Sequence, residues 1–211
     1  EPPLEIPGEN WPSRVDMDLM NVTEGVYLVT GVRTGFRHLV VETGQGLVVA
    51  DAPAGWVELT QIPPVDLVPG LGVSGLSERL VDYIKQELPG RKFRAVVLTH
   101  VHDDNDGGAR AFAAEGAAVY APAGVAGFLE TALNGPSMPA DRLAAVNGTV
   151  DVIPVGATMR LDDADNPIEL LPIESSPHTE HALGIWLPKS DLLFQSDLHL
   201  PSSDAPPPRQ H

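Results

Sequence analysis

The sequence of 211 residues contains no cysteine. Disulfide bonds, iron–sulfur clusters and thiolate zinc sites are therefore excluded, and any bound metal must take histidine and carboxylate ligands. Lysine and arginine are also scarce, with 13 residues against 29 aspartate and glutamate residues and a formal net charge of −16. Because phosphate backbones and anionic membranes are bound through clustered basic residues, we expect neither nucleic acid nor a membrane as a partner.

Long apolar runs are missing as well, and none approaches the roughly 20 residues that span a bilayer. The chain begins with Glu1 rather than methionine, so we expect that a segment has been removed. Cleavage of a signal peptide would make the protein periplasmic or secreted, which is slightly favoured over a cytoplasmic location; a chain trimmed in another way would look the same.

Composition divides the chain into three regions. Residues 1–14 are rich in proline and polar residues and are predicted to form an N-terminal arm, and residues 201–211 form a proline-rich tail. Residues 15–200, between them, are long enough for one domain with a substantial hydrophobic core, since 43% of the chain is hydrophobic.

Apolar patterning predicts the elements of this domain. Strands are predicted at residues 26–30, 38–42, 47–50, 95–98, 117–121, 150–155, 159–161, 168–173, 183–187 and 192–195. Helices are predicted from an N-cap at Ser77 to residue 88, over residues 109–115 and over residues 125–133, with an irregular loop at residues 55–75. Helices between the early strands and antiparallel-looking strands later in the chain predict a layered, sheet-on-sheet α/β architecture.

The most informative stretch is residues 95–108, AVVLTHVHDDNDGG, in which a buried strand runs into a histidine-rich loop. Residues two apart on an extended segment point the same way, so His100 and His102 are expected to project to one side. Two imidazoles and the carboxylate of Asp104 on one short loop suit a divalent metal. Gly107 and Gly108 then allow a tight turn into the next helix.

An isolated His-x-His is usually accidental, but this one occurs in a more specific context. Further ligand types follow far along the chain: His178 lies in a Ser-Pro-His-Thr turn, and Asp197 follows an apolar strand. Metal sites are commonly built from strand-end loops that are distant in sequence and adjacent in the fold.

Together these residues resemble the metallo-β-lactamase-fold hydrolases, over about Asn21 to Asp197. The resemblance is carried by four motifs, His100-x-His102-x-Asp104, Pro177-His178-Thr179, Ser196-Asp197 and the early strand end Asp51-Ala52-Pro53. It is closest to an uncharacterised branch of the family. It implies a four-layer αββα sandwich with metals at one edge between the sheets. Members hydrolyse β-lactams, lactones, thioesters, phosphodiesters and other esters, so the resemblance does not name the substrate.

The resemblance also implies a set of metal ligands. His100, His102 and His178 match the ligands of the first metal. Asp197 matches the carboxylate that bridges two metals, and Asp104 matches a ligand of the second metal that can also handle a proton.

Two departures from the family pattern affect the second metal. Asn105 stands where the family usually has histidine, and an amide oxygen is a weak ligand beside an imidazole. The family's final histidine follows a further helix and strand, whereas this chain stops 14 residues past Asp197, at His211. We therefore expect one tightly bound Zn²⁺, a weak or missing second site, and a fold that lacks the family's usual C-terminal elements.

Several polar residues near the motifs match no family ligand. We expect His181 and His199 to face solvent or to hydrogen-bond to residues of the site. Asp103 is expected to be a solvated loop acid, although with Asp104 and Asp106 it could help to hold a cation. His38 begins a strand and is expected to pack or to form a hydrogen bond.

The leading hypothesis is a metal-dependent hydrolase that acts on an ester, lactone or amide-like small molecule through a metal-bound hydroxide. Asp104 or Asp197 would orient the nucleophile and transfer a proton. The alternative, favoured by Asn105 and the absent C-terminal ligand, is a degenerate, non-catalytic member that binds metal or serves a structural role. Redox chemistry at a di-iron site is a third and poorer match. If the C-terminal elements are lacking, an exposed sheet edge or apolar patch would favour a homodimer.

Overall fold

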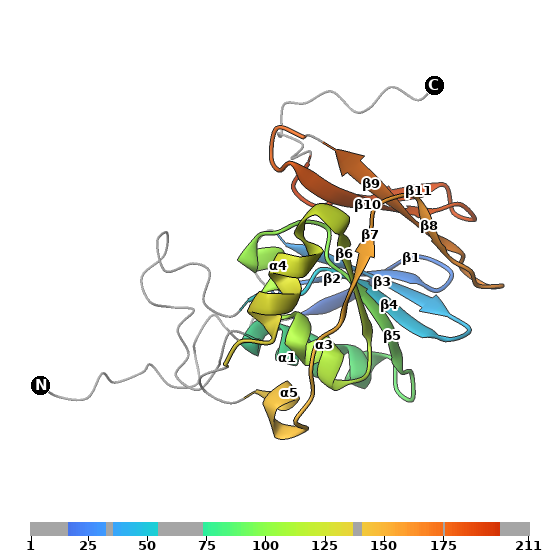
Figure 1. Ribbon diagram of the computed structural model, residues 1–211. Coiled ribbons are helices and arrows are strands. Elements are labelled where there is room, and N and C mark those ends of the chain that lie inside the picture. The colour runs from blue at the N-terminus through green and yellow to red at the C-terminus, as the bar shows by residue number, and fades with distance from the viewer. Residues whose placement is uncertain (1–16, 33–35, 55–73, 137–140, 175, 199–211) are drawn as a thin grey trace, which may run out of the picture.

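The computed structural model describes residues 17–32, 36–54, 74–136, 141–174 and 176–198. Their strands form two sheets, one of seven strands in the order β1-β2-β3-β4-β5-β6-β7 and one of four in the order β11-β10-β9-β8. Figure 1 shows the four-stranded sheet lying across one side of the seven-stranded sheet, with the helices on the opposite side. The predicted layered α/β architecture is therefore confirmed.

The seven-stranded sheet begins as an antiparallel meander and continues as a parallel sheet from β4 to β7. Its strands are β1 (Asp18–Thr23), β2 (Val26–Thr30), β3 (Arg37–Thr43), β4 (Gly46–Ala50), β5 (Phe93–Val97), β6 (Ala118–Pro122) and β7 (Val152–Val155). The helices that follow its parallel strands are α1 (Gly75–Glu87), α2 (Asp103–Asp106), α3 (Ala109–Ala114), α4 (Ala123–Leu133) and α5 (Arg142–Ala145). Because parallel strands share one direction, the carboxyl ends of β4 to β7 meet at one edge.

The four-stranded sheet is antiparallel throughout and consists of β8 (Met159–Leu161), β9 (Ile168–Glu174), β10 (His181–Leu187) and β11 (Leu192–Phe194). It is attached to the first sheet just beyond β5. His100 pairs with Ala182 in an isolated bridge, and the amide of Leu183 donates to the carbonyl of Thr99 at 2.7 Å. The loop between β9 and β10 is thereby held against the carboxyl end of β5.

The hydrophobic core has two parts, because alternate residues of a strand face opposite sides. Val96 belongs to the cluster packed between the first sheet and the helices, together with Ile84 and Phe112. Val97, the next residue, belongs to the cluster between the two sheets, together with Leu183. Continuous apolar runs in β4 and β5 are thus explained by burial on both faces.

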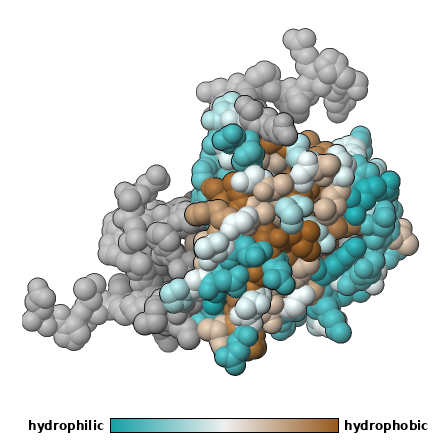
Figure 2. Space-filling model, viewed as in Figure 1, coloured by the Kyte–Doolittle hydropathy of each residue, from teal (hydrophilic) through white to brown (hydrophobic). Residues whose placement is uncertain are grey.

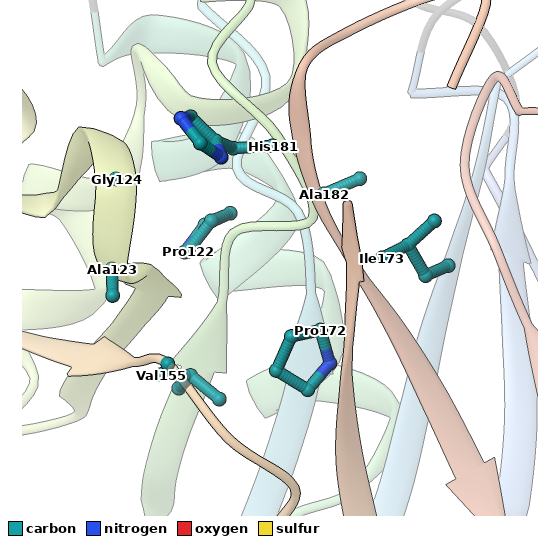
Figure 3. Close-up of a pocket in the computed structure, with 9 residues that line it drawn as sticks. Pro122, Ala123, Gly124, Val155, Pro172, Ile173, His181 and Ala182 are labelled. Carbon is teal, nitrogen blue, oxygen red and sulfur yellow. The ribbon is translucent and has the colours of Figure 1, made fainter. Parts of the chain in front are cut away.

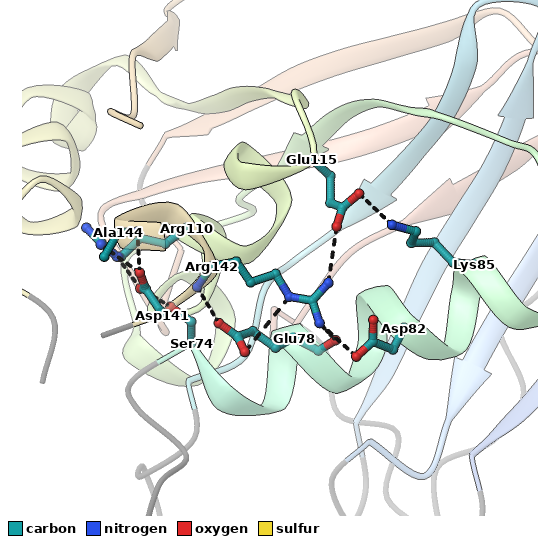
Figure 4. Close-up of polar contacts among 9 residues, drawn as sticks. All are labelled: Ser74, Glu78, Asp82, Lys85, Arg110, Glu115, Asp141, Arg142 and Ala144. Atoms are coloured by element: carbon teal, nitrogen blue, oxygen red, sulfur yellow. Dashed lines mark hydrogen bonds and ion pairs between the residues drawn. The ribbon is translucent and has the colours of Figure 1, made fainter. Parts of the chain in front are cut away.

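The helical layer is held together by charged residues around α5 (Figure 4). Asp141 caps α5 by accepting from the amide of Ala144 at 2.9 Å, and its carboxylate also accepts from Arg110 Nη2 at 2.9 Å and Ser74 Oγ at 3.0 Å. Arg142, the first residue of α5, pairs with Asp82 on α1 at 2.7 Å. These contacts tie α5 to α1 and α3.

All ten predicted strands are found, and their ends differ from the prediction by at most two residues. Three elements were not predicted, the mainly exposed strand β1 and the four-residue helices α2 and α5. The N-cap of α1 is Ser74 rather than Ser77. Ser77 lies inside the first turn, where its hydroxyl donates to the carbonyl of Pro53 at 2.9 Å, so a tertiary contact rather than a cap accounts for this serine.

Other predictions fall partly or wholly outside the described residues. The N-terminal arm at residues 1–14, the tail at residues 201–211 and most of the predicted loop at residues 55–75 are among these. The described residues supply three layers of the expected αββα sandwich, with no described helix on the outer face of the four-stranded sheet (Figure 1). No described helix has the length and apolar character needed to cross a membrane.

The surface in the view of Figure 1 is mixed in character. Figure 2 shows apolar side chains gathered across the middle of this face, around β7, with hydrophilic side chains around its margin. Since β7 pairs with β6 and is an edge strand of the described first sheet, these apolar residues lie beside one edge of that sheet.

Candidate metal centre

Three histidine rings converge beyond the carboxyl end of β5. The Nε2 atom of His100 lies 3.0 Å from Nδ1 of His102 and 3.2 Å from Nε2 of His178, which the β9–β10 loop supplies. The three ring centroids are 4.7–4.9 Å apart, and the ring planes cross at 74–89°. Each ring thus presents one nitrogen to a shared point, and all three nitrogens lie within 4.8 Å of one another.

This geometry fits a bound metal ion. Zinc–nitrogen bonds of 2.0–2.1 Å in a tetrahedral site place neighbouring ligand nitrogens about 3.3 Å apart, close to the separations of 3.0 and 3.2 Å observed here. Each neutral imidazole has one nitrogen lone pair, and a cation at the shared point would accept all three.

The environment of His100 keeps its ring neutral. Burial, together with the neighbouring rings of His102 and His178, lowers the pKa of His100 to about 4, while the carboxylate of Asp197 acts in the opposite direction. The other nitrogen of the ring, Nδ1, lies 3.0 Å from Thr99 Oγ1. Thr99 therefore fixes the ring so that Nε2 faces the cluster.

The two predicted acidic residues lie beside the histidines and meet around Asn105. Oδ2 of Asp197 is 3.8 Å from Nε2 of His100. The buried amide nitrogen of Asn105 donates to Asp104 Oδ1 at 3.2 Å and to Asp197 Oδ2 at 3.3 Å. Its amide oxygen accepts from Ser196 Oγ at 3.1 Å. The structure thus brings all five predicted site residues together, and Asn105 connects them.

Asp51, at the end of β4, contacts the cluster indirectly through Thr99. Its Oδ1 accepts from the backbone amide of Thr99 at 2.8 Å, so it positions the residue that contacts His100. Burial raises the pKa of Asp51 to about 7, with a smaller contribution from the charge of Asp197. Asp51 and Asp197 both adopt left-handed backbone conformations, with φ of 63° and 59°, a strain that concentrates at functional sites.

The other polar residues have separate positions. His181 lies on β10 with its ring against Gly124 of α4, outside the three-histidine cluster. His38 is buried and its Nδ1 lies 3.2 Å from the carbonyl oxygen of Ala50, which confirms the expectation of packing and hydrogen bonding. His199 and the side chain of Asp103 lie outside the described part of the chain.

Sequence reasoning did not identify Thr99 or Ser196 as supports of the site. Each is adjacent to a predicted ligand, Thr99 before His100 and Ser196 before Asp197. Their position next to a predicted ligand was the one feature of the sequence that could have identified them. Only the fold shows that Thr99 contacts the ring of His100 and that Ser196 donates to Asn105, 91 residues earlier in the chain.

Comparisons with known proteins agree with this geometry. The sequence profile of the Metallo-beta-lactamase superfamily matches residues 67–209. A metallo-beta-lactamase from Pontibacter korlensis is similar in structure, with a TM-score of 0.55, 23% identity and coverage of 84% of this chain and 69% of that one. For the DIM-1 metallo-beta-lactamase the corresponding values are 0.54, 21%, 84% and 67%.

A third similar structure has a different named activity. The stereoselective inverting sec-alkylsulfatase Pisa1 from Pseudomonas sp. has a TM-score of 0.53 and 20% identity, with coverage of 82% of this chain and 30% of that one. No curated protein sequence matches the chain. At these identities the structural likeness establishes the fold and not the substrate.

Proposed function

Because the chain belongs to the metallo-beta-lactamase superfamily, we propose that it is a metal-dependent hydrolase of an ester, lactone or amide-like small molecule. The observation that carries this proposal is the convergence of the ring nitrogens of His100, His102 and His178. Their rings come from two strand-end loops of different sheets. The partner is then a small-molecule substrate, in keeping with a chain of net charge −16 that carries few basic residues.

The three histidines would hold the metal, and Zn²⁺ is the ion that this ligand set suits best. Three neutral histidines with an open fourth position are a common arrangement of catalytic zinc. When bound, such an ion supplies Lewis acidity, which lowers the pKa of water toward about 7 and stabilises negative charge on a substrate oxygen.

The protein's own residues would orient the reactants and move the proton. The carboxylate of Asp104 or Asp197 accepts the proton of the attacking water and returns it to the leaving group. Asn105 holds both carboxylates in place, since its amide nitrogen donates to each of them. Thr99 and Asp51 hold the ring of His100, so that its Nε2 stays directed at the cluster.

We further propose that the centre takes one metal ion tightly. The acidic residues that would serve a second ion, Asp104 and Asp197, already accept hydrogen bonds from the uncharged amide of Asn105. That amide satisfies part of the carboxylates' hydrogen-bonding capacity without supplying a positive charge.

A second candidate function is that of a non-catalytic metal-binding or structural member of the same fold. The hydrogen bonds of Asn105 favour this candidate. Asn105 contacts Asp104, Asp197, Ser196 and His100, and it thus serves as a structural hydrogen-bonding residue at a position where a strong metal ligand would be needed for a second ion. The two candidates differ in one measurable property, turnover by the metal-loaded protein.

Elemental analysis of protein purified without added metal tests the metal site. We expect about one equivalent of zinc per chain, and its loss in His178→Ala. His181→Ala is the matched control: it removes a histidine from the same hairpin, three residues away, and should retain the metal. Hydrolysis of a panel of simple esters by the loaded protein then separates enzyme from non-catalytic member. Metal binding that is unchanged in His178→Ala would overturn the proposal.

A further inference from the structure

A pocket of about 150 Å³ opens between α4, the end of β7 and the β9–β10 hairpin (Figure 3). None of the roles described above accounts for it. It is lined by residues from five elements, β6, α4, β7, β9 and β10, and from the turn after β7: Pro122, Ala123, Gly124, Val155, Gly156, Pro172, Ile173, His181 and Ala182.

The pocket lies on the same sheet edge as the three-histidine cluster. Strand β6, which ends at Pro122, is the parallel neighbour of β5, and the chain beyond β5 carries His100. On the second sheet, Ala182 lines the pocket and pairs with His100 in an isolated bridge. Since neighbouring strands are about 4.8 Å apart, the pocket begins roughly 5–10 Å from His100.

The side chains that line the pocket are apolar apart from that of His181, and polar atoms of the backbone and of His181 share the exposed surface with them. In Figure 3, Pro172 and His181 point from the hairpin toward α4, while Ile173 and Ala182 point to the other side of their strands. The pairing of Ala182 with Ile173 in the β9–β10 register agrees with this arrangement. A cavity of about 150 Å³ lined by apolar groups can hold a benzene-sized ligand.

His181 contributes the one polar side chain of the lining. Its ring lies against the first turn of α4, so closely that a Cβ atom added at Gly124 would be 2.4 Å from Nε2. Among the described residues, its ring nitrogens have no hydrogen-bond partner, and they can donate or accept. Glycine is therefore needed at position 124, because the side chain of any larger residue would overlap with the ring of His181.

We propose that this pocket is the specificity subsite of the metal centre. It binds a compact apolar group of up to about six ring atoms, attached to the scissile carbonyl of the substrate, and His181 meets a hydrogen-bonding atom at its rim. The substrate class is then an ester or amide of a small aromatic or similarly compact acid. The catalytic part of this inference rests on the proposed function, whereas binding in the pocket does not.

Binding is tested on the metal-free protein with phenol as the probe, followed by backbone NMR. We expect saturable shifts of the amides of Gly124, Gly156 and Ala182, and weaker binding of the larger 2-naphthol. Gly124→Ala should weaken phenol binding by about tenfold, since the ring of His181 must move. Gly127→Ala is the matched control on the same helix, because a Cβ there meets nothing within 4 Å.

If Gly124→Ala fails to fold, Gly156→Ala provides a second variant. Its added Cβ would lie 3.3 Å from Cβ of Ala123, another residue of the lining, and should also weaken phenol binding. Absence of saturable shifts in the wild type, or equal affinities in the wild type and the folded variants, would overturn the proposal.

Catalysis is tested with two esters of the same leaving group, 4-nitrophenyl benzoate and 4-nitrophenyl 2-naphthoate. We expect kcat/KM to favour the benzoate by about tenfold or more, with the preference reduced in Gly124→Ala and kept in Gly127→Ala. Phenol binding without hydrolysis of either ester would overturn the proposed function and leave the binding pocket intact. Hydrolysis of both esters at rates that do not depend on Gly124 would overturn the subsite alone.

Discussion

The side-chain amide of Asn105 donates a hydrogen bond to the carboxylate of Asp197, with 3.3 Å between Nδ2 and Oδ2. The same nitrogen is 3.2 Å from Asp104 Oδ1 and 3.4 Å from His100 Nε2. A neutral donor thus stands between two carboxylates that in a binuclear centre would face a cation. This relationship connects the sequence departure at residue 105 to the number of metals that the site can hold.

Replacing Asn105 by histidine tests that connection. An imidazole removes the amide donor and adds a strong ligand, so Asn105→His should raise the zinc content from about one to about two equivalents per chain. Elemental analysis after gel filtration measures it. Asn21→His, on the exposed face of β1, is the control and should stay at the wild-type value. An unchanged content in Asn105→His would show that another ligand limits the second site.

The ion pair of Arg110 and Asp141 should be a main support of the helical layer. Asp141 accepts from Arg110, Ser74 and the amide of Ala144, and both charged side chains are largely buried. Asp141→Ala leaves the guanidinium of Arg110 buried without its partner, so we expect a loss of about 3–5 kcal/mol in the free energy of unfolding.

Urea denaturation measures this loss, and Asp82→Ala is the matched control. Asp82 pairs with Arg142 in the same layer, but its side chain is 66% exposed, so its removal should cost less than about 1 kcal/mol. Equal losses in the two variants would show that burial of the Asp141–Arg110 ion pair does not increase its contribution to the free energy of unfolding.

The buried His38 should make stability depend on pH. Burial lowers its pKa to about 4, against about 6.5 in an unfolded chain. Between these values the unfolded state binds the proton and the folded state does not, so stability falls as pH falls. From pH 7.5 to pH 5 this group should cost about 2 kcal/mol.

The variant His38→Phe isolates this effect. Asp51 acts with the opposite sign, since its pKa is raised to about 7 and the folded state holds its proton at lower pH, but it is present in both proteins. On going from pH 7.5 to pH 5, the wild type should therefore lose about 2 kcal/mol more unfolding free energy than His38→Phe does. If the unfolding free energies of the two proteins changed equally with pH, this prediction would be contradicted.

The sequence was most informative where one local pattern decided the structure. Alternating and continuous apolar runs located the strands, because burial on one or both sheet faces fixes which residues can occupy them. The spacing of His100 and His102 put both rings on one side of an extended segment, as observed. The position of His178 beside them followed from the family resemblance and not from any local pattern.

Features that depend on distant contacts could not be predicted. Ser74 and Ser77 are both good N-cap residues, and the carbonyl of Pro53, which accepts from Ser77, decides between them. Helix α5 has four residues, too few to show a helical period. The linking role of Asn105 depends on Ser196, whose hydroxyl is brought to it only by the packing of the two sheets.

The outer face of the four-stranded sheet carries an apolar patch around Leu193 and, among the described residues, is covered by no helix (Figure 1). Leu193 on β11 is 55% exposed. The three atoms nearest to a Cβ placed at Gly184, on the same face, belong to Leu193, Ile173 and Leu171 of its own sheet. Strand β11 is also an edge, pairing with β10 alone in the described sheet. Apolar faces beside free edges favour association.

We therefore predict that the chain forms a homodimer through this face. Sedimentation over a range of concentrations should show a monomer–dimer equilibrium, and Leu193→Lys should shift it toward the monomer, because a charge would be buried at the interface. Phe128→Lys, at a residue of α4 that is 66% exposed, changes a large apolar side chain outside this sheet and should leave association unchanged. A wild-type chain that stays monomeric at high concentration, or equal effects of the two substitutions, would rule this interface out.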